Sequence, residues 1–172
     1  MTEPMNDDAS AQSFELRAGA LRLALRPDLG GAIAGLWHHG VPVLRSQEPG
    51  QLASWRNAAT FPLVPYSNRI DHGRFNWQGR PYQLAPNFDG SPHPLHGVGH
   101  QSVWQIEPTR GPSGPAEVVL TLAHRADEGW PFDFQARQLF QLGPTSLRAE
   151  LSVTNTSAQA APFGLGWHPY FP

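Results

Sequence analysis

The chain has 172 residues, enough for one domain with a sizeable core, and its 12 basic and 14 acidic residues give a net charge of −2. Every basic residue is arginine and there is no cysteine, which excludes a catalytic or P-loop lysine, a thiol nucleophile, disulfides and cysteine-ligated zinc. The balanced charge argues against binding nucleic acid through its phosphates. No segment resembles a signal peptide or a membrane span, so we expect a cytoplasmic protein without a membrane partner.

In chain order, residues 1–12 are predicted to form a disordered tail and residues 13–172 a single β domain. Apolar and polar residues alternate in the way that is typical of strands over residues 21–26, 75–77 and 82–84, 118–123, 132–142 and 147–154. Gln78-Gly79 predicts a hairpin, and Gly143-Pro144 marks the turn between the last two strands. Because no helical periodicity stands out, the pattern predicts an antiparallel all-β fold, a sandwich or a barrel.

Two long segments, residues 45–59 and 85–100, resist strand assignment and are predicted to be functional loops. The second contains His93, His96 and His100, with Asp89 available as a carboxylate. These residues allow a metal site, but the His93–His96 spacing would place the two rings on opposite faces of a strand. We therefore expect no metal and no cofactor. The remaining histidines, His38, His39, His72 and His124, are predicted to be surface residues.

The segment Gly166-Trp167-His168-Pro169-Tyr170-Phe171 offers the strongest chemical signal. Pro169 biases His168 toward an extended backbone, and the aromatic neighbours give the imidazole a stiff setting. A histidine held in this way suits general acid or base catalysis near neutral pH, although a structural core histidine remains the alternative.

Several short motifs occur in a fixed order: Asn68-Arg69-Ile70, Gly73-Arg74-Phe75, Asn87, Leu95-His96-Gly97, Val153-Thr154-Asn155 and the segment around His168. Together these motifs resemble the aldose 1-epimerase (galactose mutarotase) family over about residues 14–172. The resemblance implies an antiparallel β-sandwich that interconverts the α and β anomers of a free aldose without a cofactor. It also implies that His168 is the general acid at the ring oxygen and that His96 assists it. Arg69, with Asn68 and Tyr170, would bind the monosaccharide.

The family's general base is a glutamate that lies beyond the motif around His168, and this sequence has no counterpart of it. The resemblance therefore covers only an N-terminal portion of the family's domain, and we expect impaired activity and self-association through exposed sheet edges. A non-catalytic carbohydrate-binding module is the alternative function. A glycoside hydrolase would need two flanking carboxylates, and the cluster Asp127, Glu128 and Asp133 looks like solvated surface instead. Arg56, Arg69 and Arg74 show no sign of convergence, which favours a neutral over a phosphorylated sugar.

Overall fold

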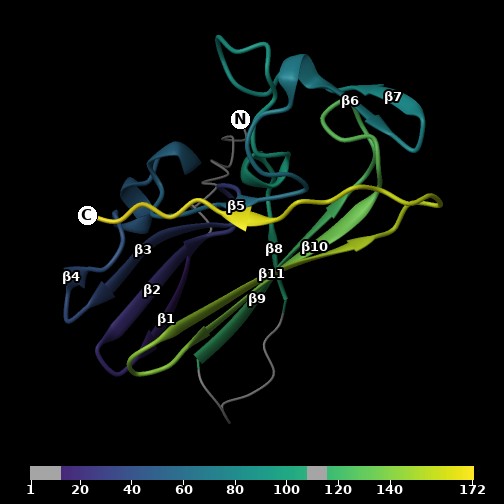
Figure 1. The fold of residues 1–172 in the computed structure, drawn as a ribbon. Helices are drawn as coiled ribbons and strands as arrows, with labels where there is room; N and C mark the ends of the chain where they lie inside the picture. Colours follow the sequence, from purple (N-terminus) through teal and green to yellow (C-terminus); the bar gives the residue numbers. More distant parts are fainter. Residues whose placement is uncertain (1–12, 108–115) are drawn as a thin grey trace, which may run out of the picture.

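The computed structural model describes residues 13–107 and 116–172, so the predicted tail over residues 1–12 lies outside it (Figure 1). Over these ranges the fold is antiparallel β, and helical residues are confined to short 3-10 turns: η1 (Pro49–Gln51), η2 (Trp55–Asn57), η3 (Asp71–Gly73) and η4 (Gly99–Gln101). The predicted fold class is confirmed. Within the described part, no helix has the length and apolar character needed to cross a membrane.

The first sheet contains the strands β1 (Phe14–Ala18), β2 (Leu21–Arg26), β3 (Ala32–His38) and β4 (Val41–Pro42), in that order. The strand predicted over residues 21–26 is β2, and its Leu23 and Leu25 are fully buried. Arg26, a polar position of the alternation over residues 21–26, is nevertheless only 5% exposed. Its guanidinium pairs with Asp28 and donates to the carbonyls of Pro49 and Leu52, which satisfies the buried charge.

The second sheet has the order β11-β10-β9-β8, with β8 (Gln105–Glu107), β9 (Ala116–His124), β10 (Phe134–Leu142) and β11 (Leu147–Asn155). The predicted apolar face of β10 is confirmed: Phe134, Ala136, Phe140 and Leu142 are all buried. Gln138, which interrupts that face, is fully buried as well, and its Nε2 donates to the carbonyl of Gly31 at 3.2 Å. This polar residue thus ties the second sheet to the loop between β2 and β3.

The two sheets pack against each other through one apolar core. The core joins leucines of β1–β3 to side chains of β9 and β10, with Trp104, Trp130 and Phe132 filling the space beside them. Figure 1 shows the C-terminal segment (yellow) running across both sheets. A sheet-on-sheet core therefore forms the platform on which that segment lies.

Two short strand pairs complete the fold. The strand β5 (Pro62–Leu63) pairs with β12 (Gly166–Trp167), and β6 (Arg74–Trp77) pairs with β7 (Arg80–Gln83). The second pair is the predicted hairpin, and its turn residues Gln78 and Gly79 have φ angles of 48° and 76°, as a two-residue type I′ turn requires. The two long segments, residues 45–59 and 85–100, contain no strand and only the short turns η1, η2 and the start of η4, so their prediction as loops is confirmed.

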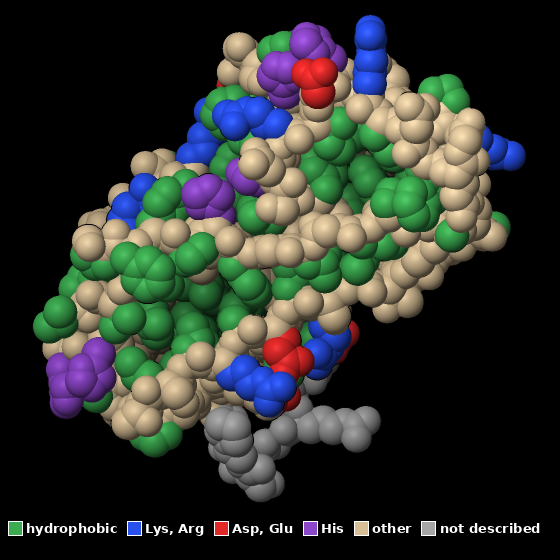
Figure 2. All heavy atoms as spheres, viewed as in Figure 1, with side chains coloured by type: hydrophobic (Ala, Val, Ile, Leu, Met, Phe, Trp, Pro, Cys, Tyr) green, Lys and Arg blue, Asp and Glu red, His purple; other side chains and the backbone are tan. Residues whose placement is uncertain are grey.

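Apolar side chains gather in hollows on the face shown in Figure 2. One groove of about 550 Å³ runs between the first sheet and the β10–β11 turn, and it is lined mainly by Leu21, Leu36, Val43, Leu44, Leu147 and Phe171. The strand β11 is an edge of its sheet over the described residues. Such grooves and edges favour association, and self-association stays a prediction.

Candidate active site

Two loop segments that run antiparallel to each other hold the first histidine of the site. The amide of His96 donates to the carbonyl of Asn68 at 3.0 Å, and Arg69 forms an isolated antiparallel bridge with Leu95. Both Asn68 and His96 have left-handed backbones, with φ angles of 68° and 62°. This conformation is uncommon for residues other than glycine, and such residues concentrate at functional sites.

The imidazole of His96 is oriented by a backbone donor. The amide N–H of Asn68 donates to Nδ1 of His96 at 3.0 Å, so the neutral ring carries its proton on Nε2. Burial, together with the nearby His168 and Arg69, lowers the pKa of His96 to about 4. At neutral pH this ring is therefore an uncharged hydrogen-bond donor through Nε2.

The second histidine lies on the extended segment after β12. The amide of His168 donates to the carbonyl of Phe61 at 3.1 Å, which fixes its backbone. Its ring stacks on Phe61 and on Tyr170, with centroids 5.0 and 4.7 Å away, and it meets the ring of His96 edge-on at 5.3 Å. The aromatic setting predicted for His168 is confirmed, and the structure brings His96 and His168 together.

Tyr170 is itself anchored by a residue that the sequence did not single out. The guanidinium of Arg45 lies 3.9 Å from the centre of the Tyr170 ring, and its Nη2 donates to the carbonyl of Ala58 at 2.8 Å. Backbone hydrogen bonds join Tyr170 to Arg45 and to Ala59. A cation held against an aromatic face in this way stabilises the ring's position.

A buried layer supports the two histidines from below. His100 is 1% exposed, and its ring packs edge-on against Trp55 at 4.3 Å and lies 5.9 Å from Phe61. Burial lowers the pKa of His100 to about 4, and a hydrogen bond with the backbone of His96 offsets this only in part. His100 is thus a neutral core residue, and His93, His96 and His100 are not gathered into one metal site.

Asn87, one of the quoted motif residues, has a structural role. Its Nδ2 donates to the carbonyls of Leu95 and Gly97 at 2.9 and 2.8 Å, and its Oδ1 accepts from the amide of Leu95 at 2.6 Å. These contacts clamp the segment on both sides of His96. Asp89 lies apart: its side chain is 99% exposed, and its carboxylate is 3.7 Å from Arg56.

The three arginines considered for phosphate recognition separate into two groups. Arg69 lowers the pKa of His96 and Arg56 that of His100, so both lie within electrostatic reach of these neighbouring rings. Arg74 instead donates to the side chain of Gln83 across the β6–β7 hairpin.

The acidic cluster considered for glycoside hydrolysis makes hydrogen bonds within its own loop. Asp133 pairs with Arg125 and accepts from the amide of Ala126, and Asp127 accepts from the amides of Gly129 and Trp130. These two carboxylates therefore stabilise the turn between β9 and β10.

The predictions for the remaining histidines are confirmed with one exception. His38, His39 and His72 are exposed. The prediction for His124 is wrong, because its side chain is only 8% exposed, stacks on Phe134 and contacts the carbonyl of Trp130 at 2.9 Å. Its position at the end of β9, where the strand still faces the core, explains the burial.

The site thus combines a neutral imidazole donor, a second imidazole on an aromatic surface, and the cation of Arg69. No carboxylate of the described residues is among the charges that shift the pKa of His96. Tyr66 does not supply a base either, because burial raises its pKa to about 12. The protein is thus an antiparallel β-sandwich whose loops hold two neighbouring imidazoles above its core.

Comparison with known proteins identifies the family. Residues 12–172 match the family described as aldose 1-epimerase. The chain is 40% identical over 159 residues to YphB of Escherichia coli K12, a protein of uncharacterised function, and this match covers 92% of the chain but 51% of YphB. YihR of the same organism, also uncharacterised, is 30% identical over 166 residues, or 96% of the chain and 52% of YihR.

Solved structures agree with this assignment. A protein of E. coli K12 with a provisional assignment as an aldose 1-epimerase superposes with a TM-score of 0.81 at 39% identity, covering 93% of this chain and 52% of that one. A galactose mutarotase-like protein of Clostridium acetobutylicum, at 23% identity and a TM-score of 0.79, shares the fold over 91% of this chain and 49% of its own. The chain belongs to the aldose 1-epimerase family and spans about half the length of these relatives.

Proposed function

We propose that this site takes part in the interconversion of the α and β anomers of a free aldose. The observation that carries the proposal is the pairing of His96 and His168, whose ring centroids lie 5.3 Å apart. The ring of His96 is a neutral donor, the ring of His168 is assigned here as the acid, and Arg69 adds a cation within electrostatic reach of His96. The family membership supports the same chemistry.

The reaction needs two proton transfers. A base removes the proton from the hydroxyl on C1, the bond from C1 to the ring oxygen breaks, and the protonated imidazole of His168 gives its proton to that oxygen. After rotation about the bond from C1 to C2, the ring closes on the other face and both transfers reverse. His168 is regenerated in its protonated form, so the cycle consumes no cofactor.

The other residues hold the sugar in place for this exchange. His96 donates through Nε2 to the ring oxygen or to a neighbouring hydroxyl. The fork of Arg69 and the amide group of Asn68 donate to sugar hydroxyls, and Tyr170 offers an apolar face to the C–H groups of the ring. Neutral donors, with Arg69 as the cation that contacts the sugar, suit an uncharged aldose. Comparing glucose with glucose 6-phosphate as substrates tests that preference.

The base in this proposal is a carboxylate supplied from outside the 172 residues. We therefore expect the isolated chain to catalyse mutarotation slowly or not at all, and the longest reading frame that contains it to be active. The alternative is a carbohydrate-binding module, which the lack of a described carboxylate beside His96 favours.

Polarimetry on freshly dissolved α-D-glucose or α-D-galactose separates the two functions. In the longest reading frame, His168→Asn should lower the rate about 10²- to 10⁴-fold, the usual contribution of a general acid. His38→Asn, at an exposed histidine distant from His168 in the sequence, is the matched control and should keep the full rate. Sugar binding without acceleration by the unaltered protein would establish the binding module, and an active His168→Asn variant would refute the acid assignment. Robust activity of the isolated chain would require another base, of which Asp89 is the first to test.

A further inference from the structure

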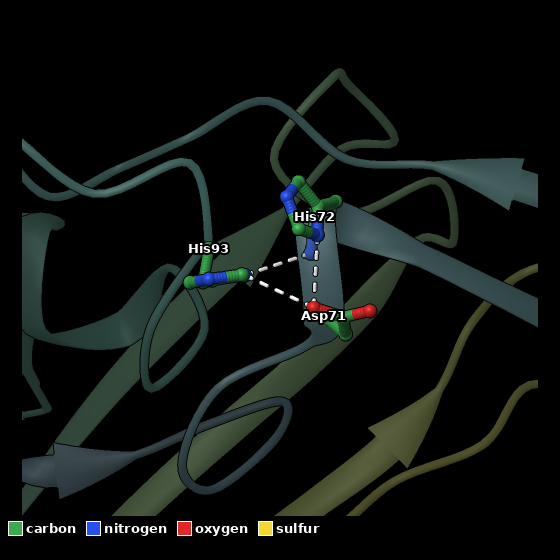
Figure 3. Close-up of side chains that lie close together, drawn as sticks. All are labelled: Asp71, His72 and His93. Atoms are coloured by element: carbon green, nitrogen blue, oxygen red, sulfur yellow. Dashed lines mark hydrogen bonds and ion pairs between the residues drawn. The ribbon is translucent and has the colours of Figure 1, made fainter.

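The antiparallel segments that hold His96 carry a second cluster of side chains at their other end. Asp71 and His72 belong to the turn η3, and His93 lies in the opposite segment. Figure 3 shows the three side chains converging, with contacts from His93 to both other residues. One nitrogen or oxygen from each lies within 4.8 Å of the others.

The distances in this cluster match those of a small metal site. Asp71 Oδ1 lies 2.9 Å from Nδ1 of His72 and 3.4 Å from Nδ1 of His93. Ligand atoms at tetrahedral zinc bonds of about 2.0–2.2 Å are roughly 3.3–3.5 Å apart, so the Asp71–His93 distance already fits and the other distances, all within 4.8 Å, would adjust on binding. The left-handed backbone of His72, with φ at 46°, brings these consecutive side chains together.

The protonation pattern also suits metal binding. Nδ1 of His93 accepts the amide N–H of His72 at 2.9 Å, so the neutral ring carries its proton on Nε2 and keeps a lone pair on Nδ1, 3.4 Å from Oδ1 of Asp71. Nδ1 of His72 faces the carboxylate, and a neutral imidazole exposes that lone pair by moving its proton to Nε2. A metal ion would bind Nδ1 of His93 in place of the His72 amide N–H, and Nδ1 of His72 in place of the proton shared with Asp71.

The geometry points to a binding site for a late first-row divalent cation, Zn²⁺ or Ni²⁺, formed by Asp71, His72 and His93. Two imidazoles with one carboxylate prefer such ions to Mg²⁺ or Ca²⁺. The side chains of Asp71 and His72 are 86% and 59% exposed, which leaves positions for water or another ligand. This differs from the expectation of a metal-free chain, since the sequence grouped His93 with His96 and His100 instead.

A bound ion would join the two segments that position the candidate active site. Between the cluster and the Asn68–His96 pair, the amide of Ile70 donates to the carbonyl of Pro94, and Arg69 bridges Leu95. A metal ion bound at one end of these paired segments would therefore slow the breaking of their hydrogen bonds at the other end. The metal site does not depend on the proposed activity, because binding is measured directly.

Isothermal titration of the purified, untagged chain with ZnCl₂ tests the site. We expect saturable binding of one ion, and Asp71→Asn and His93→Gln should each weaken it about tenfold or more, while MgCl₂ gives no saturable signal. The matched control is the double variant His38→Gln/His39→Gln, which removes an exposed pair with ring centroids 4.6 Å apart and should leave the affinity unchanged.

A second measurement does not depend on how the variants fold. Substoichiometric NiCl₂ should broaden the ring resonances of His72 and His93 before those of His38 and His39 in the unaltered protein. Equal broadening of all four, absence of saturable zinc binding, or loss of zinc affinity only in the control variant would each overturn the proposal.

Discussion

Phe140 in β10 and Phe61 beside His168 are both almost fully buried, yet their surroundings differ. Phe140 lies opposite Val118 and Ala149 in its sheet and packs in an apolar core. Phe61 is surrounded by aromatic and titratable rings, among them His96, His100 and His168. The core gains free energy by removing apolar surface from water, whereas the site region places imidazoles where their charged forms are disfavoured. Burial thus mainly stabilises the fold around Phe140, whereas around Phe61 it also lowers the pKa of the neighbouring His96 and His100.

The largest effect should come from the core. Phe140→Ala leaves a cavity between the sheets and should lower the free energy of unfolding by about 3–5 kcal/mol. Chemical denaturation measures this loss. Phe171→Ala is the control, because that side chain is 71% exposed and its removal should change stability little. A loss below about 1 kcal/mol for Phe140→Ala would mean that the sheets are not held together by this core.

The clamp around His96 should show an intermediate effect. Asn87→Ala removes three hydrogen bonds of the His96 segment, at about 1 kcal/mol each, so we expect a loss of about 2–3 kcal/mol. Hydrogen exchange should localise the change to the amides of residues 95–99. The exposed Asn76→Ala in β6 is the comparison variant. Uniform acceleration of exchange across both sheets would contradict a local clamp.

The buried imidazoles should give the smallest effect, visible in the pH dependence of stability. The folded pKa of His100 is about 4, below its ordinary value of 6.5, so the unfolded chain binds more protons between these values. The free energy of unfolding should therefore be at its full value above pH 6.5 and fall, by about 1–3 kcal/mol, as the pH drops toward 4.

Denaturation midpoints measured across this pH range test the slope. His100→Leu removes one of the two buried titrating groups and should make the profile shallower, while His38→Leu at the surface should leave it unchanged. An unaltered slope in the His100→Leu variant would show that other groups, such as His96, control the acid response.

Strands whose apolar and polar residues alternate could be predicted from the sequence, as β2, β9 and β10 show, although β2 is buried on both faces. The strand β3 could not, because its first six residues are all buried and lack the alternation that marks a strand with a wet face. Its small residues, Ala32, Ala34 and Gly35, give no strong strand signal either.

The site was predictable where a local motif marks it. His96, His168, Asn68, Arg69 and Tyr170 lie in such motifs, and the structure brings the two histidines together with Tyr170. Phe61 and Arg45 were missed because their contacts with the C-terminal segment join positions more than 100 residues apart, and nothing in their immediate sequence shows it. The grouping of His72 with His93, 21 residues apart, was missed because it depends on the pairing of two loops that no local motif shows.

The pairing of β12 with β5 also sets an order of assembly during synthesis. Phe61 and Ala59 leave the ribosome long before His168 and Tyr170, whose amides donate to their carbonyls. Translation of about 100 intervening residues at ~5–20 residues per second takes about 5–20 s. Both sheets can pair during this interval, while the backbone from Ala59 to Leu63 waits without its partner strand. This backbone is therefore among the last of the described segments to find its partner, and a nascent chain paused before Gly166 would expose it to chaperones or to other chains.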